Sequence, residues 1–150
     1  MRIMIADSHP EVRAAMRLLL EEDSATWIVA SEASSAIELI NKTRSANPRV
    51  ILVDWDLPGL RFGPGNFDFQ RTDKIFVALR AIAPKAKVLV LGTLPESKTA
   101  VMQAGADAFI CKSESPQQLL GVIKELEQGL ASDQPPSWTT LPNIPIEPSQ

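Results

Sequence analysis

Short apolar runs and longer amphipathic segments alternate along the first 130 residues of the chain. The apolar runs hold mostly β-branched or aliphatic side chains, which is typical of strands buried on both faces, and they occupy residues 3–6, 27–30, 50–53, 87–91 and 108–111. Between them, apolar side chains recur at helical spacing and predict helices over residues 9–22, from Ser35 to Pro48, around residues 75–82, over residues 95–104 and after Ser115. Five alternations of strand and helix predict one parallel sheet with right-handed crossovers and helices on both faces.

Capping signals support the starts of three helices. In each case a serine stands three residues before a glutamate or glutamine, as a capping box requires: the pairs are Ser8 with Glu11, Ser35 with Glu38, and Ser115 with Gln118. Pro10 and Pro116 fit the first turns of two of these helices, and Gly105 fits the left-handed end of the fourth. Ile37 and Ile40 are predicted to form the buried face of the second helix.

Length and composition indicate one globular domain over residues 1–130. The chain has 150 residues, of which 45% are hydrophobic and 22% are charged, enough to bury a core. A formal charge of −3 with no cluster of Lys or Arg argues against direct binding of nucleic acid. A single cysteine excludes an internal disulfide, and no segment has the apolar length of a signal peptide or membrane span. We therefore expect a cytoplasmic protein without membrane contact.

Residues 131–150 differ from the rest of the chain. Five prolines in this stretch remove backbone donors too often for regular structure, so it is interpreted as an extended or disordered tail. Its apolar residues, among them Trp138 and Leu141, leave open that it packs on its own domain or on a neighbour. A tail of this kind cannot form a helix-turn-helix module, so any output is expected to run through a partner protein or a homodimer.

Three charged side chains stand at the ends of three predicted strands. Asp7 follows the first strand, Asp54 the third and Lys112 the fifth. In a doubly wound sheet with strand order 2-1-3-4-5, the first and third strands flank the switch point, so both carboxylates would share one crevice. Two carboxylates at such a short distance repel each other unless a cation such as Mg²⁺ lies between them. The ammonium group of a lysine can bind an anion. These are the parts needed to take up a phosphoryl group.

The order and spacing of these residues resemble the receiver domain of two-component response regulators. The segments that carry the resemblance are residues 5–10 (IADSHP), 53–59 (VDWDLPG) and 105–112 (GADAFICK), within residues 1–130. The resemblance implies a flavodoxin-like three-layer sandwich and phosphorylation of Asp54 by a histidine kinase or phosphotransfer protein, with Lys112 at the phosphoryl oxygens. It also implies a Mg²⁺ site formed by Asp7, Asp54 and the backbone carbonyl of Asp56. Such a domain is a signalling module of a phosphorelay and not an enzyme, beyond catalysing its own phosphorylation and dephosphorylation.

Two positions depart from the family pattern. Ser8 stands where the resemblance implies a second acidic metal ligand; it is interpreted either as a weaker ligand or simply as a helix N-cap. Gly92 stands at the end of strand four, where the family carries Ser or Thr, and Thr93 could supply that hydroxyl if the strand ends one residue late. Phe109 matches the aromatic switch residue on strand five and is also explained as an ordinary core side chain.

Two further features lie near the crevice. The connection over residues 60–71 is longer than usual, and is interpreted as a loop that packs its own aromatic side chains or as a lid or docking surface near Asp54. His9 is interpreted as a helix-start residue rather than a metal ligand, because no cysteine or second histidine accompanies it.

The leading hypothesis is therefore a response regulator receiver that accepts a phosphoryl group on Asp54 and signals through protein contacts. The alternative is a pseudo-receiver that acts as a phosphorylation-independent interaction module, a reading motivated by Ser8 and Gly92. A flavodoxin-like binder of a small cofactor would have the same fold, but residues 7–10 lack the Gly-rich phosphate loop that it needs.

Overall fold

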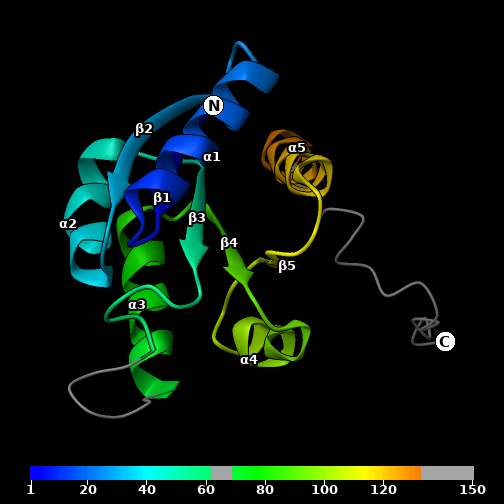
Figure 1. Ribbon diagram of the computed structural model, residues 1–150. Coiled ribbons are helices and arrows are strands. Elements are labelled where there is room, and N and C mark those ends of the chain that lie inside the picture. The colour runs from blue at the N-terminus through cyan, green and yellow to red at the C-terminus, as the bar shows by residue number, and fades with distance from the viewer. Residues whose placement is uncertain (62–68, 133–150) are drawn as a thin grey trace, which may run out of the picture.

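The computed structural model describes residues 1–61 and 69–132, and it contains one parallel sheet of five strands (Figure 1). The strand order is β2-β1-β3-β4-β5, as the alternation of elements predicts. The strands are β1 (Arg2–Ala6), β2 (Ile28–Ala33), β3 (Val50–Asp54), β4 (Lys87–Gly92) and β5 (Ala108–Cys111). The predicted fold class, a doubly wound α/β sandwich, is confirmed.

Helices cover both faces of the sheet. The helical elements are α1 (Pro10–Asp23), α2 (Ala36–Ala46), α3 (Phe69–Ile82), a 3₁₀ turn η1 (Pro95–Ser97), α4 (Lys98–Gln103) and α5 (Pro116–Ser132). Alternate strand residues face opposite layers: Ile3 and Ile5 pack with α1 and α5, whereas Met4 and Ala6 pack with α2, α3 and α4. Both faces of the central strands are therefore buried, which explains their unbroken apolar runs.

The carboxyl ends of β1, β3, β4 and β5 meet at one edge of the sheet. In the register of the strands, Ala6 pairs with Val53, and Gly92 with Cys111. Two backbone hydrogen bonds extend this order beyond the strands: Trp55 N donates to Leu91 O at 2.8 Å, and Lys112 N donates to Gly92 O at 2.7 Å. The residues that follow each strand are consequently held at fixed positions beside one another.

Two of the three predicted helix caps are confirmed, and one is wrong. Ser35 Oγ accepts a hydrogen bond from Glu38 N at 3.2 Å, and Ser115 Oγ accepts one from Gln118 N at 3.2 Å. Ser8 does not cap α1, because the helix begins at Pro10 and its N-cap residue is His9. The carboxylate of Asp7 accepts the backbone N–H of His9 and so binds a donor at the helix start.

Three other expectations need correction. β2 starts after Trp27 and continues through the polar Ser31 and Glu32, because an edge strand needs only one buried face. Ile37 is 65% exposed, whereas Ile40 packs against the core as predicted; the buried residues of α2 are mainly small, namely Ala36, Leu39, Thr43 and Ala46. α3 begins at Phe69, inside the predicted connection.

The remaining part of that connection, residues 62–68, and residues 133–150 of the predicted tail lie outside the described residues. Among the described helices, none combines the length and the apolar character that crossing a bilayer would require.

Candidate functional site

Asp54 is the last residue of β3 and the centre of the crevice at the sheet edge. It is 3% exposed, and its Oδ1 lies 3.0 Å from Lys112 Nζ and accepts a hydrogen bond from Asp56 N at 3.1 Å. Its backbone carbonyl accepts a hydrogen bond from Leu57 N at 3.0 Å, which folds the chain into a turn. Gly59 continues this turn with a φ of 86°, a left-handed conformation that favours glycine. The β3 ladder and this turn together fix the carboxylate.

Asp7 lies beside Asp54 because β1 and β3 are neighbours in the sheet. It is 2% exposed, and its two carboxylate oxygens have different partners. Oδ1 accepts the backbone N–H of His9 at 2.8 Å and lies 2.9 Å from His9 Nδ1, whereas Oδ2 lies 3.7 Å from Lys112 Nζ. One ammonium group thus faces two buried carboxylates, as the sequence predicts.

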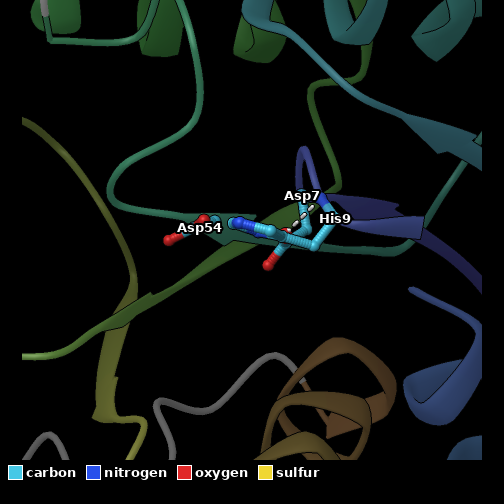
Figure 2. A group of neighbouring side chains, drawn as sticks. All are labelled: Asp7, His9 and Asp54. Atoms are coloured by element: carbon cyan, nitrogen blue, oxygen red, sulfur yellow. Dashed lines mark hydrogen bonds and ion pairs between the residues drawn. The ribbon is translucent and has the colours of Figure 1, made fainter. Parts of the chain in front are cut away.

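The charges in the crevice favour a further cation. Asp7 and Asp54 contribute two negative charges and Lys112 one positive charge, so this group carries a net charge of −1. Burial lowers the effective dielectric constant around these groups, so an added divalent cation would interact more strongly here than at the surface. The donor set suits such an ion, because ligand atoms of Asp7, His9 and Asp54 all lie within 4.8 Å of one another (Figure 2).

His9 is a candidate metal ligand that the sequence reasoning set aside. It is the helix-start residue predicted for α1, but its imidazole extends from the helix start toward Asp54 (Figure 2). A histidine two residues after the strand-end aspartate is the signal that could have identified it, because a turn of that length returns the side chain to the carboxylate.

Thr93 and Phe109, the residues expected to sense a phosphoryl group, lie near the end of β4 and on β5. β4 ends at Gly92, and Thr93 follows as an exposed residue whose backbone carbonyl lies 3.5 Å from Cys111 Sγ. A Cβ atom added to Gly92 would lie 2.7 Å from Cε1 of Phe109. The Phe109 ring therefore occupies the space that a side chain at position 92 would fill, and it packs against the core on the α4 side.

An arginine spans the turn after β3. Arg61 Nε donates to the backbone carbonyl of Trp55 at 2.9 Å, and the guanidinium lies 5.0 Å from the centre of the Trp55 ring. The same guanidinium forms an ion pair with the exposed side chain of Asp56. These contacts hold the turn that carries the Asp56 backbone next to Asp54.

A second layer of charges supports the end of β1. Arg13 Nη1 donates to the carbonyl of Asp7 at 2.7 Å, and both Arg13 and Arg17 bind the carboxylate of Glu32 on β2. Burial alone would raise the pKa of Glu32, but the hydrogen bonds and charges of the two arginines outweigh it and hold that pKa below its usual value. α1 is thereby tied to the edge of the sheet next to the crevice.

Comparisons with known proteins agree with this geometry. The family model described as "Response regulator receiver domain" matches residues 3–124. Among curated proteins, "Nitrate/nitrite response regulator protein homolog" of Haemophilus influenzae is 30% identical over 132 residues, covering 86% of this chain and 58% of the relative. "Oxygen regulatory protein NreC" of Staphylococcus epidermidis is 27% identical, covering 100% of this chain and 65% of the relative. The chain therefore spans about three fifths of the length of these relatives.

Solved structures show the same architecture. A two-component response regulator of the LuxR family from Aurantimonas sp. superposes with a TM-score of 0.66 at 28% identity, covering 87% of this chain and 85% of that one. A response regulator receiver domain protein from Methanospirillum hungatei gives a TM-score of 0.68 at 24% identity, covering 88% and 97% of the two chains, and supports the fold.

Proposed function

Because this chain belongs to the response regulator receiver domain family, we propose that it accepts a phosphoryl group on Asp54 and relays the signal through protein contacts. Receiver domains are signalling domains of two-component systems. The proposal assigns roles to individual residues, to a metal ion and to partner proteins of this chain.

The observation that supports Asp54 as the acceptor is its contact with Lys112. The carboxylate is buried at a strand end, and the ammonium lies 3.0 Å from its Oδ1. In the proposed step, an Asp54 oxygen attacks the phosphorus of a phosphohistidine; a P–O bond forms, the P–N bond breaks, and the departing imidazole takes a proton. The Lys112 ammonium would neutralise the phosphoryl oxygens through charge-assisted hydrogen bonds.

Asp7, Asp54 and the backbone carbonyl of Asp56 are the proposed ligands of Mg²⁺. When bound, the ion would neutralise the charge of the phosphoryl oxygens and orient the group. Two contacts within the chain would keep these ligands in position. Asp56 N donates a hydrogen bond to Asp54 Oδ1, and the Arg61 guanidinium forms an ion pair with the Asp56 side chain. Ser8 as a further ligand, Thr93 as the phosphoryl-binding hydroxyl and Phe109 as the switch residue stay predictions.

The proposed partners follow from this chemistry. A histidine kinase or phosphotransfer protein would supply the phosphoryl group, and an output protein or a second copy of the chain would receive the signal. A cytoplasmic location and signalling without direct nucleic-acid contact by this domain stay predictions as well. The nitrate, nitrite and oxygen responses in the names of the relatives belong to those proteins.

Intact-protein mass spectrometry tests the acceptor. The chain is incubated with a small phosphodonor, with and without Mg²⁺, beside two variants: Asp54→Asn, which removes the nucleophile, and Glu22→Gln, which removes an exposed carboxylate in the last turn of α1, outside the proposed site. We expect the mass of one phosphoryl group on the parent and on Glu22→Gln, only with Mg²⁺, and none on Asp54→Asn. Labelling of Asp54→Asn would exclude Asp54 as the acceptor. The lack of any adduct would instead support the phosphorylation-independent interaction module.

A further inference from the structure

β2 is the longer of the two edge strands of the sheet (Figure 1). It has 6 residues, against 4 in β5, and β1 is its one neighbouring strand among the described residues. The outer side of an edge strand carries backbone N–H and C=O groups that can pair with a strand of another chain, and a very short strand is less suited to such pairing. The outer side of β2 is therefore the part of this sheet most open to contact between molecules.

Val29 and Glu32 direct their backbone groups away from β1. Ile28 N donates a hydrogen bond at 2.9 Å and Ala33 O accepts one at 3.0 Å, in both cases with the residues directly before and after β1. Consecutive residues of a strand direct their backbone groups to opposite sides, so the residues next to these two face outward. A register shift within the ladder explains why Val29 and Glu32 are an odd number of residues apart.

Two side chains of α1 bind both outward groups of Val29. Glu21 Oε2 accepts the backbone N–H of Val29 at 2.9 Å, and Arg17 Nη1 donates to its carbonyl at 3.3 Å. The two side chains lie one turn apart on α1, with Arg17 Nη1 at 3.7 Å from Glu21 Oε2. One residue of β2 thus finds an acceptor and a donor on its outer side, as it would beside another strand.

Contacts with Glu32 extend this cover to the other outward residue. Arg17 Nη2 lies 2.6 Å from Glu32 Oε2, so one guanidinium reaches from Val29 to Glu32. From α2, on the opposite face of the sheet, Lys42 Nζ donates to the backbone carbonyl of Glu32 at 2.9 Å. Lys42 is itself paired with Glu38 at 3.3 Å. Charged side chains from both helical layers therefore bind the outward groups of β2.

The surroundings of this edge would favour association if the charged side chains were absent. Leu18 and Ile28 are 60% and 54% exposed. Leu18 lines the same shallow surface groove as Arg17, Glu21 and Glu32. Apolar side chains beside an unpaired strand edge promote pairing between chains, whereas charged side chains on the edge oppose it. Loss of the charged groups would expose backbone groups and apolar contacts together.

We propose that Arg17 and Glu21 act as a surrogate strand, which keeps the outer edge of β2 from pairing with β2 of a second copy of this chain. Lys42 protects the carboxyl end of the same edge. Two β2 strands related by a twofold axis would pair antiparallel and join both sheets into one. This role is separate from the proposed phosphorylation of Asp54. The competing explanation is that the two side chains only attach α1 to the sheet, so that their removal lowers stability without causing association.

Amide hydrogen exchange and sedimentation velocity test the proposal on the double variant Arg17→Ala/Glu21→Ala. Alanine preserves the helical propensity of α1. In dilute solution the Val29 amide of this variant should exchange about tenfold faster or more than in the parent, because it has lost a charged acceptor. At higher concentration the variant should associate more than the parent, and exchange at Val29 should slow again because the second copy supplies a new acceptor.

Glu22→Ala/Arg44→Ala is the matched control. It removes the same two charges from exposed residues that form no hydrogen bond with the described strand β2, and it should change neither the exchange at Val29 nor the association. Circular dichroism checks that each variant is folded. If the double variant is unfolded, Glu21→Ala alone takes its place, since it leaves Arg17 bound to Glu32. Association no greater than that of the control, or association without renewed protection at Val29, would overturn the proposal.

Discussion

Replacing Gly92 by alanine should destabilise the domain through a clash with one aromatic ring. The added Cβ would lie 2.7 Å from Cε1 and 3.1 Å from Cζ of Phe109, whereas carbon atoms pack best at about 3.5–4.0 Å. The third neighbour, Cβ of Trp55 at 3.7 Å, is at an ordinary contact distance. To avoid this clash, the Phe109 ring would have to turn out of its half-buried position and lose contacts with the core.

The size of the effect follows from two opposing contributions. Inserting a methyl group into a filled site costs about 1–3 kcal/mol of unfolding free energy. The backbone of Gly92 lies outside the left-handed region, so alanine also stabilises by about 0.4–1 kcal/mol through a less flexible unfolded chain. The net expectation is a loss of about 1 kcal/mol, with an upper bound of about 2.5 kcal/mol. In the Phe109→Leu background the clash is removed, and alanine should be neutral or slightly stabilising.

The parent, Gly92→Ala, Phe109→Leu and the double variant form a double-mutant cycle. The free energy of unfolding of all four is measured by urea denaturation followed by far-UV circular dichroism. Gly121→Ala is the matched control, because a Cβ there meets no atom within 4 Å and the residue lies within α5. This control should gain about 0.5–1 kcal/mol, the usual preference for alanine over glycine in a helix. The reasoning is refuted if Gly92→Ala is as stable as the parent or more stable, or if its cost is the same with Phe109→Leu present.

Two other predictions concern the supports of the site. Ser35→Ala should lower the free energy of unfolding by about 1 kcal/mol because it removes the N-cap of α2. Ser8→Ala should lower it clearly less, because Ser8 caps no helix. Equal losses in chemical denaturation would contradict the assigned caps. Glu32→Gln should lower the unfolding free energy by about 1 kcal/mol at neutral pH. Because the folded pKa of Glu32 is lowered, this contribution is present above the ordinary value of 4.5 and is lost as the pH falls through the folded pKa. The difference between parent and variant in unfolding curves should therefore shrink as the pH is lowered below 4.5, and a constant difference would contradict it.

The sheet could be predicted because its strands are buried on both faces. A run such as residues 50–53 has no polar position, and few other structures accommodate it. The bounds of the edge strand β2 were harder to predict, because the polar residues Ser31 and Glu32 belong to the strand but interrupt its apolar pattern. Glu32 is tolerated there because arginines from α1 bind its carboxylate, a contact that no local pattern reveals.

The meeting of Asp7, Asp54 and Lys112 could be predicted from strand order alone. Parallel strands place their carboxyl ends at one edge, so the three side chains needed only the correct topology to converge. The orientation of His9 could not be predicted, because it depends on where α1 begins and on which donor the Asp7 carboxylate accepts. The position of the Phe109 ring over Gly92 likewise depends on packing between neighbouring strands.

Lys112 has a consequence for folding as well as for chemistry. Its ammonium is a built-in counter-ion for two buried carboxylates, and its backbone N–H is bound to the end of β4. The lysine therefore offsets part of the repulsion between the two carboxylates. A substitution that removes this ammonium is therefore expected to lower the free energy of unfolding as well as phosphoryl transfer, because it would leave two buried carboxylates facing each other.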